Sequence, residues 1–149
     1  MQSRMPGIYS LAADGYQAMI ALEAFIGRGG VPRSTLDLVR LRVSQINGCA
    51  VCVDMHARDA KKAGETDERI WSIAAWRETP YYSDEERAAF ALAEAATRLA
   101  DHPEGVSDAV WDEAADHYSE EDLAVLVMAI ASINAWNRIN ATTRRPVAS

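Results

Sequence analysis

The sequence predicts an all-α fold, a single domain spanning residues 1–149 and built as a bundle of about seven helices. Apolar residues recur three and four positions apart along most of the chain, which is the spacing of one helix face. Ser and Thr residues suited to N-caps precede several segments, and no run shows the period-two alternation of a strand. A chain of 149 residues has the usual length of one domain, and no linker, repeat or low-complexity segment divides it.

Two helices are predicted before the first cysteine. The first has an apolar face of residues spaced alternately four and three apart, formed by Ile8, Ala12, Gly15, Met19, Leu22 and Ile26. The glycines at positions 27, 29 and 30 end it. The second opens at Pro32 and Ser34 and stops at the turn pair Asn47-Gly48.

A third helix is predicted from Cys49 to Gly64, which places a Cys-x-x-Cys pair at its N-terminus. Four further helices are expected to begin after the N-cap residues Thr66, Ser83, Ser107 and Ser119. Glu86 and Asp122 stand three positions after Ser83 and Ser119, the spacing of a capping box. The tail, residues 142–149, is predicted to fray.

The last helix is apolar on nearly every side between Leu123 and Trp136. It is either the central core helix of the domain or, together with the first helix, part of a homo-oligomer interface. The two interpretations are compatible. This apolar stretch of 14 residues is shorter than the roughly 20 that cross a bilayer, so no membrane span is predicted.

Charge and cysteine content narrow the possible partners and compartment. The chain has 15 Lys and Arg against 22 Asp and Glu, a net charge of −7, which argues against binding to a nucleic acid backbone. Asp14 and Glu23 interrupt the apolar start, so no signal peptide is expected and a cytoplasmic location is predicted. Cys49 and Cys52 are the only cysteines, fewer than a secreted disulfide scaffold carries.

The predicted chemistry lies in the segment from Cys49 to His56. At about 100° per residue, Cys49, Cys52 and His56 fall within an arc of about 60° on one helix face. They occupy the first two turns, where the positive end of the helix dipole favours a thiolate. His56 follows Cys52 by one turn and is placed to accept its proton, while Cys49 is placed to resolve an oxidised Cys52 as a disulfide.

Two other interpretations of these residues stay open. Cys-x-x-Cys with a nearby His is compatible with zinc, although a structural zinc site takes four ligands and no second pair follows at finger spacing. The cysteines are alternatively small buried hydrophobes, with His56 a hydrogen-bonded core residue. A redox motif is favoured over both, but its position after a helix instead of a strand argues against a thioredoxin fold.

The run from Leu38 to Cys49, continued by Cys52, Asp54, Met55, His56, Asp59, Ala60 and Gly64, resembles the carboxymuconolactone decarboxylase and alkylhydroperoxidase D-like (AhpD-like) superfamily. The segment Ile133–Arg138 is similar to one common among its peroxidase-like members. The resemblance implies an all-helical subunit without cofactor or metal that assembles into homo-oligomers. It also implies an enzyme that reduces hydroperoxides with its cysteine pair.

The resemblance also assigns roles. Cys52 would be the peroxidatic cysteine, Cys49 the resolving and donor-facing one, and His56 the proton acceptor. The family's acidic residue, usually Glu, stands twelve positions before the first cysteine, which here is Asp37. Asp37 is one methylene shorter, so we expect a water to bridge it to His56 unless Ser34-x-x-Asp37 is a capping box. Val51 replaces a histidine found in some members, so the proton relay must be simpler here.

The sequence gives weaker indications of a role for several other polar and aromatic residues. His102 and His117 have no partner nearby in sequence and are predicted to be surface or capping residues. Polar groups on the apolar last helix must be paired if buried, and they are expected to hold an interface or the cysteine-bearing helix in place. These are Asn134, Asn137, Arg138 and Asn140. Trp136 is expected in the core or an interface, with pocket lining as the alternative.

These observations together predict a thiol peroxidase that takes a hydroperoxide as substrate. Its reductant is expected to be an external dithiol, whether a lipoyl group, a thioredoxin-like protein or a small thiol. Two alternatives from other classes remain. One is a non-catalytic redox-sensing or metal-binding module. The other is a decarboxylase or isomerase acting on a lactone acid, as in other branches of the superfamily, although the paired cysteines have no evident part in that chemistry.

Overall fold

The structure is a computed structural model that describes residues 2–147. These residues form eight α-helices and one 3₁₀ helix, with no strand among them, which confirms the predicted all-α fold. In chain order the elements are α1 (Ile8–Leu11), α2 (Ala13–Ile26), α3 (Arg33–Ile46), α4 (Ala50–Lys62), α5 (Asp67–Ser72), η1 (Ile73–Glu78), α6 (Asp84–Thr97), α7 (Asp108–His117) and α8 (Glu120–Thr143).

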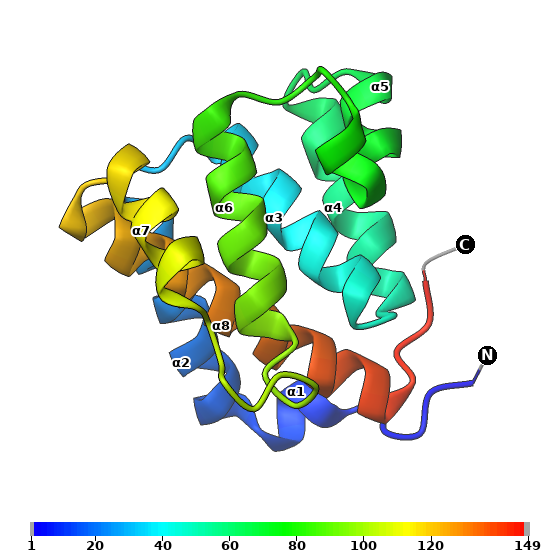
Figure 1. Ribbon diagram of the computed structural model, residues 1–149. Coiled ribbons are helices and arrows are strands. Elements are labelled where there is room, and N and C mark those ends of the chain that lie inside the picture. Colours follow the sequence, from blue (N-terminus) through cyan, green and yellow to red (C-terminus); the bar gives the residue numbers. More distant parts are fainter. Residues whose placement is uncertain (1, 148–149) are drawn as a thin grey trace.

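Helix α3 is the centre of the bundle. It packs against α4, α6 and α8, while α2 lies along α8 on the outer side (Figure 1). Its side chains are buried on most sides, including Leu38, Val39, Leu41 and Val43, because three neighbouring helices cover it. The first and last described segments lie close together, and the Arg4 N–H donates to the Thr143 carbonyl at 2.8 Å (Figure 1).

The first predicted helix is broken in two, so the prediction of one continuous helix is wrong. Ala12 leaves helical geometry, with φ −112° and ψ 44°, and separates α1 from α2. The break turns α1 toward the end of α8, where the Tyr9 hydroxyl donates to Asn140 Oδ1 at 2.6 Å. The break is therefore accompanied by a tertiary contact, which the spacing of apolar residues in the sequence cannot predict.

The turn that precedes the cysteine pair forms as predicted. Gly48 has φ 66°, a left-handed conformation that favours glycine. Cys49 is the N-cap of α4, and the helix itself begins at Ala50, one residue later than predicted. The Cys49 N–H donates to the Ser44 carbonyl at 3.0 Å, which ties the turn back to the last turn of α3.

All four predicted N-caps are present. The side-chain oxygens of Thr66, Ser83, Ser107 and Ser119 each accept a backbone N–H from three residues later. At Ser83 the capping box is complete, because Glu86 also accepts the Ser83 N–H at 3.0 Å. At Ser119 only the serine half forms. The Asp122 carboxylate instead lies so close to Gly30 that a Cβ on this glycine would stand 2.4 Å from it.

Two other boundaries differ from prediction. The helix that follows Thr66 is short, because the chain continues as η1 with a non-helical Ala75 (φ −118°, ψ 31°). Helix α8 continues to Thr143, past the point where fraying was predicted to start. Beyond it Arg145 donates its backbone N–H to the Asn140 carbonyl at 2.9 Å. The last two residues of the predicted frayed tail, 148–149, lie outside the described residues.

Helix α8 is a core helix along much of its length. Leu126, Ala129 and Ile133 are buried against the bundle, which supports the core interpretation of this segment. It is also long and apolar enough to cross a membrane by length and composition alone, as no other helix in residues 2–147 is. Its outer face leaves Val127 and Met128 exposed, and the predicted role of this face in an oligomer interface stays a prediction.

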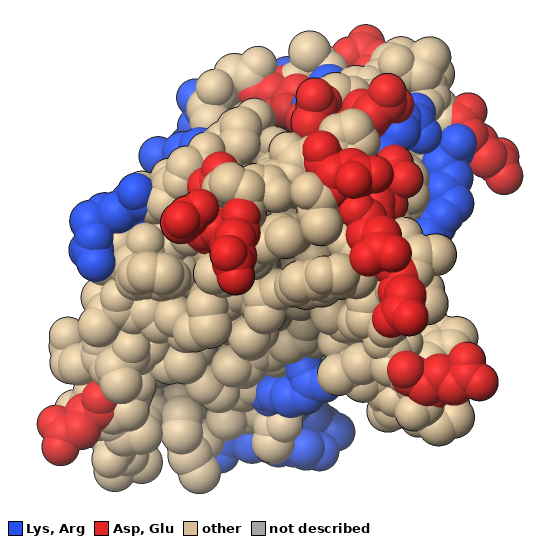
Figure 2. Space-filling model, turned by 60° about the vertical axis from the view of Figure 1, so that its left-hand side comes forward, with Lys and Arg blue, Asp and Glu red and all other residues tan. Residues whose placement is uncertain are grey.

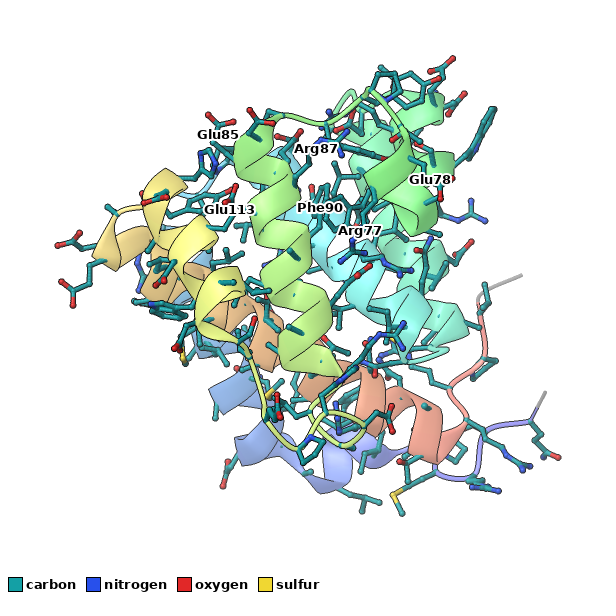
Figure 3. All side chains as sticks on the ribbon, in the orientation of Figure 1. Arg77, Glu78, Glu85, Arg87, Phe90 and Glu113 are labelled. Carbon is teal, nitrogen blue, oxygen red and sulfur yellow. A yellow bond between two sulfur atoms is a disulfide. The ribbon has the colours of Figure 1, made fainter. Side chains whose placement is uncertain are left out.

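A buried ion pair joins η1 and α6 to α3. Glu94 accepts from Arg42 Nε and Arg77 Nη1, both at 2.6 Å, and from Trp76 Nε1 at 3.0 Å. In Figure 3, Arg77 and Phe90 lie in the space between η1 and α6. Burial raises the pKa of Glu94, but the hydrogen bonds from Arg77, Arg42 and Trp76 outweigh burial and hold the pKa below its usual range.

Replacing Glu94 by glutamine should therefore lower the free energy of unfolding by about 2 kcal/mol, because charge-assisted hydrogen bonds are lost inside the bundle. Urea unfolding at pH 7 measures this change. The matched control is Glu78→Gln on the same side of the molecule, where Glu78 is exposed (Figure 3). The control should change the unfolding free energy by less than about 0.5 kcal/mol. Equal effects in the two variants would contradict the prediction.

The charge on the surface is distributed unevenly. Figure 2 shows one face of the molecule, on which acidic side chains gather in several groups around a broad area without charged side chains. Exposed large apolar residues elsewhere in the bundle include Leu11, Phe25 and Trp111. The net charge of −7 makes the surface as a whole unfavourable for a polyanion.

Candidate active site

A cavity of about 560 Å³ opens between α2, α3, α4 and α8. Its wall includes three of the four residues predicted to form the site: Cys52, His56 and Asp37. The fourth, Cys49, is bonded to Cys52 but is not part of the wall. Apolar side chains cover much of the rest, among them Leu36, Met55 and Trp136. A cavity of this size and mixed lining is typical of a small-molecule site.

The two cysteines form a disulfide, Cys49–Cys52, across the first turn of α4. Both residues are buried, with 2% of Cys49 and 1% of Cys52 exposed. Because Cys52 lines the cavity and Cys49 does not, the sulfur reached from the cavity in this oxidised state is that of Cys52. The predicted role of Cys49 as the resolving and donor-facing cysteine stays a prediction.

His56 lies one turn after Cys52 and is 9% exposed. Its Nε2 atom is buried and has no hydrogen-bond partner among the described residues. Burial and the nearby Arg40 together lower the pKa of His56 to about 4, although Asp59 and Glu23 act in the opposite direction. The imidazole is therefore neutral at pH 7, with a ring nitrogen free to interact with a molecule in the cavity.

Asp37 is a buried carboxyl group in the same wall, and the capping-box interpretation of this residue is wrong. Helix α3 begins at Arg33 with Pro32 as N-cap, and no side chain caps it. Burial raises the pKa of Asp37, although Arg40 and Arg33 act in the opposite direction. Its Oδ2 atom has no hydrogen-bond partner among the described residues and lies 3.6 Å from Arg33 Nε, so the contacts of Asp37 are to the arginines and not to His56. The predicted bridging water stays a prediction.

Glu23 and Arg40 are part of the cavity wall that sequence reasoning missed. Arg40 Nη2 donates to Glu23 Oε2 at 2.8 Å, and its Nη1 lies 3.5 Å from Asp37 Oδ1. Trp136 Nε1 also donates to Glu23, at 3.1 Å. The sequence did offer a signal for Glu23. It stands four positions after Met19 and three before Ile26, so it is a carboxylate on an otherwise apolar helix face.

Asparagines of α8 hold the turn before the cysteine pair. Asn47 Nδ2 donates to the side-chain oxygens of Asn134 and Asn137, each at 2.9 Å. Asn137 in turn donates to Ser44 Oγ at 3.1 Å. Arg138 donates to Asn134 Oδ1 at 2.9 Å. The expectation that polar groups of the last helix fix the cysteine-bearing helix agrees with these contacts.

Asn140 reaches the reactive pair itself. Its Nδ2 lies 3.4 Å from Cys52 Sγ, within the range of a hydrogen bond to sulfur.

The two other histidines, at positions 102 and 117, do not line this cavity. His117 lies 3.6 Å from Glu113 on the surface of α7, as expected of a helix-end histidine. Among residues 2–147, no group of three His, Cys, Asp or Glu side chains could hold a metal ion.

The arrangement is suited to thiol redox chemistry. Reduction of the disulfide would give a Cys52 thiol beside a neutral imidazole, an amide donor and a cavity large enough for an organic substrate. The N-terminus of α4 adds backbone N–H groups and the positive end of the helix dipole. The amide donor and the helix N-terminus favour an ionised sulfur at Cys52.

The profile of the family described as "Carboxymuconolactone decarboxylase family" matches residues 12–95. Over 138 residues the chain is 41% identical to the uncharacterized protein YdfG of Bacillus subtilis, covering 93% of this chain and 92% of that protein. A shorter segment of 45 residues is 47% identical to the alkyl hydroperoxide reductase AhpD of Bradyrhizobium diazoefficiens. That match covers 30% of this chain and 25% of the AhpD protein.

Solved structures share the fold. A protein of unknown function from Agrobacterium tumefaciens, proposed to be an antioxidant defence protein AhpD, aligns over 99% of both chains with a TM-score of 0.92 and 31% identity. The debrominase Bmp8 aligns over 94% of this chain and 74% of its own, with a TM-score of 0.84 and 23% identity, which shows a common fold alone. On its profile match, its relatives and its AhpD-like fold, the chain belongs to the carboxymuconolactone decarboxylase family, in the AhpD-like superfamily.

Proposed function

We propose that this protein is a thiol-dependent hydroperoxide reductase, an antioxidant protein of the AhpD type. The observation that carries the proposal is a disulfide-forming pair, Cys49–Cys52, that presents one sulfur to a cavity shared with His56. The family assignment supports it, since the profile match spans both cysteines, and so does the segment of 45 residues that is similar to AhpD. The cavity is large enough for an organic hydroperoxide.

In the first half of the cycle, Cys52 is the peroxidatic residue. His56 accepts the proton of the Cys52 thiol, and the thiolate attacks the terminal oxygen of the hydroperoxide. A sulfur–oxygen bond forms as the oxygen–oxygen bond breaks, so that Cys52 becomes a sulfenic acid. The alkoxide that leaves takes the proton from His56 and departs as an alcohol, or as water when the substrate is hydrogen peroxide.

In the second half, Cys49 resolves the oxidised sulfur. The Cys49 thiol attacks the sulfenic acid and releases water, which gives the disulfide seen in the structure. An external dithiol then reduces the disulfide by thiol exchange and is itself oxidised to a disulfide. The net reaction converts one hydroperoxide and one dithiol to an alcohol, water and one oxidised dithiol.

Asp37 has a supporting role in this scheme. Asp37 and His56 line the same cavity, and each has one buried atom, Asp37 Oδ2 and His56 Nε2, without a hydrogen bond among the described residues. A water or the hydroperoxide itself can bridge the two groups, which makes Asp37 a proton relay without direct contact. The scheme uses no metal or organic cofactor.

The proposed partners follow from this chemistry. They are a hydroperoxide and a lipoyl, thioredoxin-like or small-molecule dithiol, with no nucleic acid and no membrane. We also propose that copies of the chain form a homo-oligomer and that the protein acts in the cytoplasm. The exposed apolar residues of α8, Val127 and Met128, are candidates for the oligomer interface.

A steady-state assay with cumene hydroperoxide and dihydrolipoamide tests the proposal. The expected result is many equivalents of peroxide consumed per protein, above a blank that contains the dithiol alone. Consumption that stops after one equivalent would instead identify a redox sensor. The Cys49→Ser, Cys52→Ser double variant is the matched control and should not exceed the blank.

Two further measurements address the alternative functions. Zinc bound at one equivalent in protein purified without chelator would indicate a metal-binding module in place of a peroxidase. A decarboxylase or isomerase active on a lactone acid should retain its activity in the double serine variant, because that chemistry gives the sulfurs no part.

A further inference from the structure

The contact between Asn140 and Cys52 is the end of a longer chain of hydrogen bonds. Tyr9 donates its hydroxyl to Asn140 Oδ1 at 2.6 Å, and Arg145 Nη1 donates to the Tyr9 hydroxyl at 2.9 Å. Asn140 Nδ2 completes the chain at Cys52 Sγ, 3.4 Å away. Tyr9, Asn140 and Arg145 all lie outside residues 12–95, the segment that the family profile matches.

The chemistry of the side chains fixes the direction of these hydrogen bonds. A guanidinium has donors and no acceptor, so the Tyr9 oxygen must accept from Arg145. The hydroxyl proton of Tyr9 is then free to point at Asn140, whose side-chain oxygen accepts it. The amide nitrogen of Asn140 consequently faces Cys52 and donates to its sulfur.

Local structure holds each member of the chain in position. Arg144 is the only described residue other than glycine with a positive φ, at 52°, and it turns the backbone after α8. The turn carries the Arg145 guanidinium over the Tyr9 ring, 4.9 Å from its centroid. The same ring packs on Tyr16 with 4.9 Å between centroids. Asn140 itself is buried, with 6% exposed.

We propose that Asn140 is a catalytic residue that donates its amide N–H to the Cys52 thiolate, and that Tyr9 and Arg145 are positioning residues that orient this amide. The inference rests on the proposed function and adds to it a group that stabilises the nucleophile. A disulfide sulfur is a weak acceptor, whereas a thiolate accepts a charge-assisted hydrogen bond that is stronger than a neutral one. The positive charge of Arg145 at the far end polarises the chain in the same direction.

His56 contributes little to the stability of a Cys52 thiolate. Burial and Arg40 keep the pKa of His56 low, so the imidazole holds the thiol proton weakly. An ionised Cys52 therefore needs stabilisation from groups other than an imidazolium. The Asn140 amide lies within hydrogen-bonding distance of the sulfur and does not itself titrate.

The test measures thiolate formation without any peroxide. In a Cys49→Ser background the rate of Cys52 alkylation by iodoacetamide is followed against pH, since only the thiolate reacts. Asn140→Leu should move the midpoint of this curve up by about one pH unit, equivalent to about a tenfold slower alkylation at pH 6. Tyr9→Phe and Arg145→Gln should move it in the same direction by about half as much.

Two matched controls distinguish the effect of these hydrogen bonds from that of neighbouring side chains. Tyr16→Phe keeps the ring that packs on Tyr9 and removes a hydroxyl that takes no part in these hydrogen bonds, and Arg144→Gln removes the same charge one residue away. Neither should move the midpoint. An Asn140→Leu protein with the parent's circular dichroism and an unchanged midpoint would overturn the inference.

If Asn140→Leu does not fold, the conservative variants decide, and midpoints equal to the parent's in both Tyr9→Phe and Arg145→Gln overturn it as well. The two proposals fail separately. If the midpoint shifts in the Cys49→Ser background but the parent, with both cysteines, does not turn over peroxide, the proposed function is overturned and the Asn140 assignment stands. Peroxide turnover by the parent with unshifted midpoints in the variants would overturn the Asn140 assignment and leave the proposed function standing.

Discussion

Replacing Cys52 by serine should abolish peroxide turnover, with a loss of about a thousandfold or more in kcat/KM. A serine hydroxyl stays protonated at neutral pH and is a poor nucleophile toward a peroxide oxygen, whereas a thiolate is a strong one. Cys52 is also the sulfur that lines the cavity, so no other described side chain can substitute for it there. The measurement is steady-state consumption of cumene hydroperoxide with dihydrolipoamide as reductant.

The companion variant Cys49→Ser should behave differently. It keeps the nucleophile but cannot close the disulfide, so it should react once with peroxide and then stop. The sulfenic acid left on Cys52 should be trapped by dimedone and located by mass spectrometry. Turnover that survives in Cys52→Ser would remove the mechanism. A sulfenic acid found on Cys49 of the Cys52→Ser protein would exchange the two roles.

The second large effect concerns stability and pH. Burial and Arg40 lower the pKa of His56 from its ordinary 6.5 to about 4 in the folded protein. Between these two pH values the unfolded chain binds a proton at His56 that the folded chain does not, so unfolding becomes more favourable as pH falls. We therefore expect a stabilising contribution that is complete above pH 6.5 and is lost by pH 4. The shift corresponds to about 3 kcal/mol.

The measurement is the free energy of unfolding in urea at a series of pH values, for the oxidised parent and for His56→Gln. Glutamine does not titrate, so the difference between the two curves should shrink by about 3 kcal/mol from pH 7 to pH 4. The carboxyl groups, including Asp37 with its raised pKa, are common to both proteins and cancel in this difference. His102→Gln, at an exposed histidine, is the control and should follow the parent. Parallel curves for the parent and His56→Gln would contradict the expected contribution.

Local chemistry explains why much of the fold could be predicted. The four serine and threonine caps set helix starts through hydrogen bonds within three residues of each cap, which the sequence alone determines. The turn before Cys49 was predictable for the same reason, because Asn47-Gly48 combines a helix end with a residue that tolerates positive φ. The spacing of Cys52 and His56 on one helix then brings both to one cavity wall.

The failures come from contacts between distant segments. Ala12 has no breaker character, yet α1 turns there, where Tyr9 meets a residue 131 positions later in the chain. Asp37 matched the capping pattern, but the helix begins at Arg33, so its carboxyl faces the cavity and the arginines at positions 33 and 40. Glu23 reads in the sequence as an interruption of an apolar helix, and only the tertiary fold brings it to Arg40 of α3 and Trp136 of α8.

The burial of both sulfurs has a kinetic consequence for the proposed cycle. Cys52 lines the cavity and Cys49 does not, so we expect peroxide and reducing dithiol to use this one cavity in alternation. Product of the first half must leave before the second substrate can enter, which is a ping-pong sequence without a ternary complex. A dithiol present in excess would occupy the cavity of the reduced protein and compete with peroxide. Excess dithiol should therefore slow turnover, and more peroxide should relieve this inhibition.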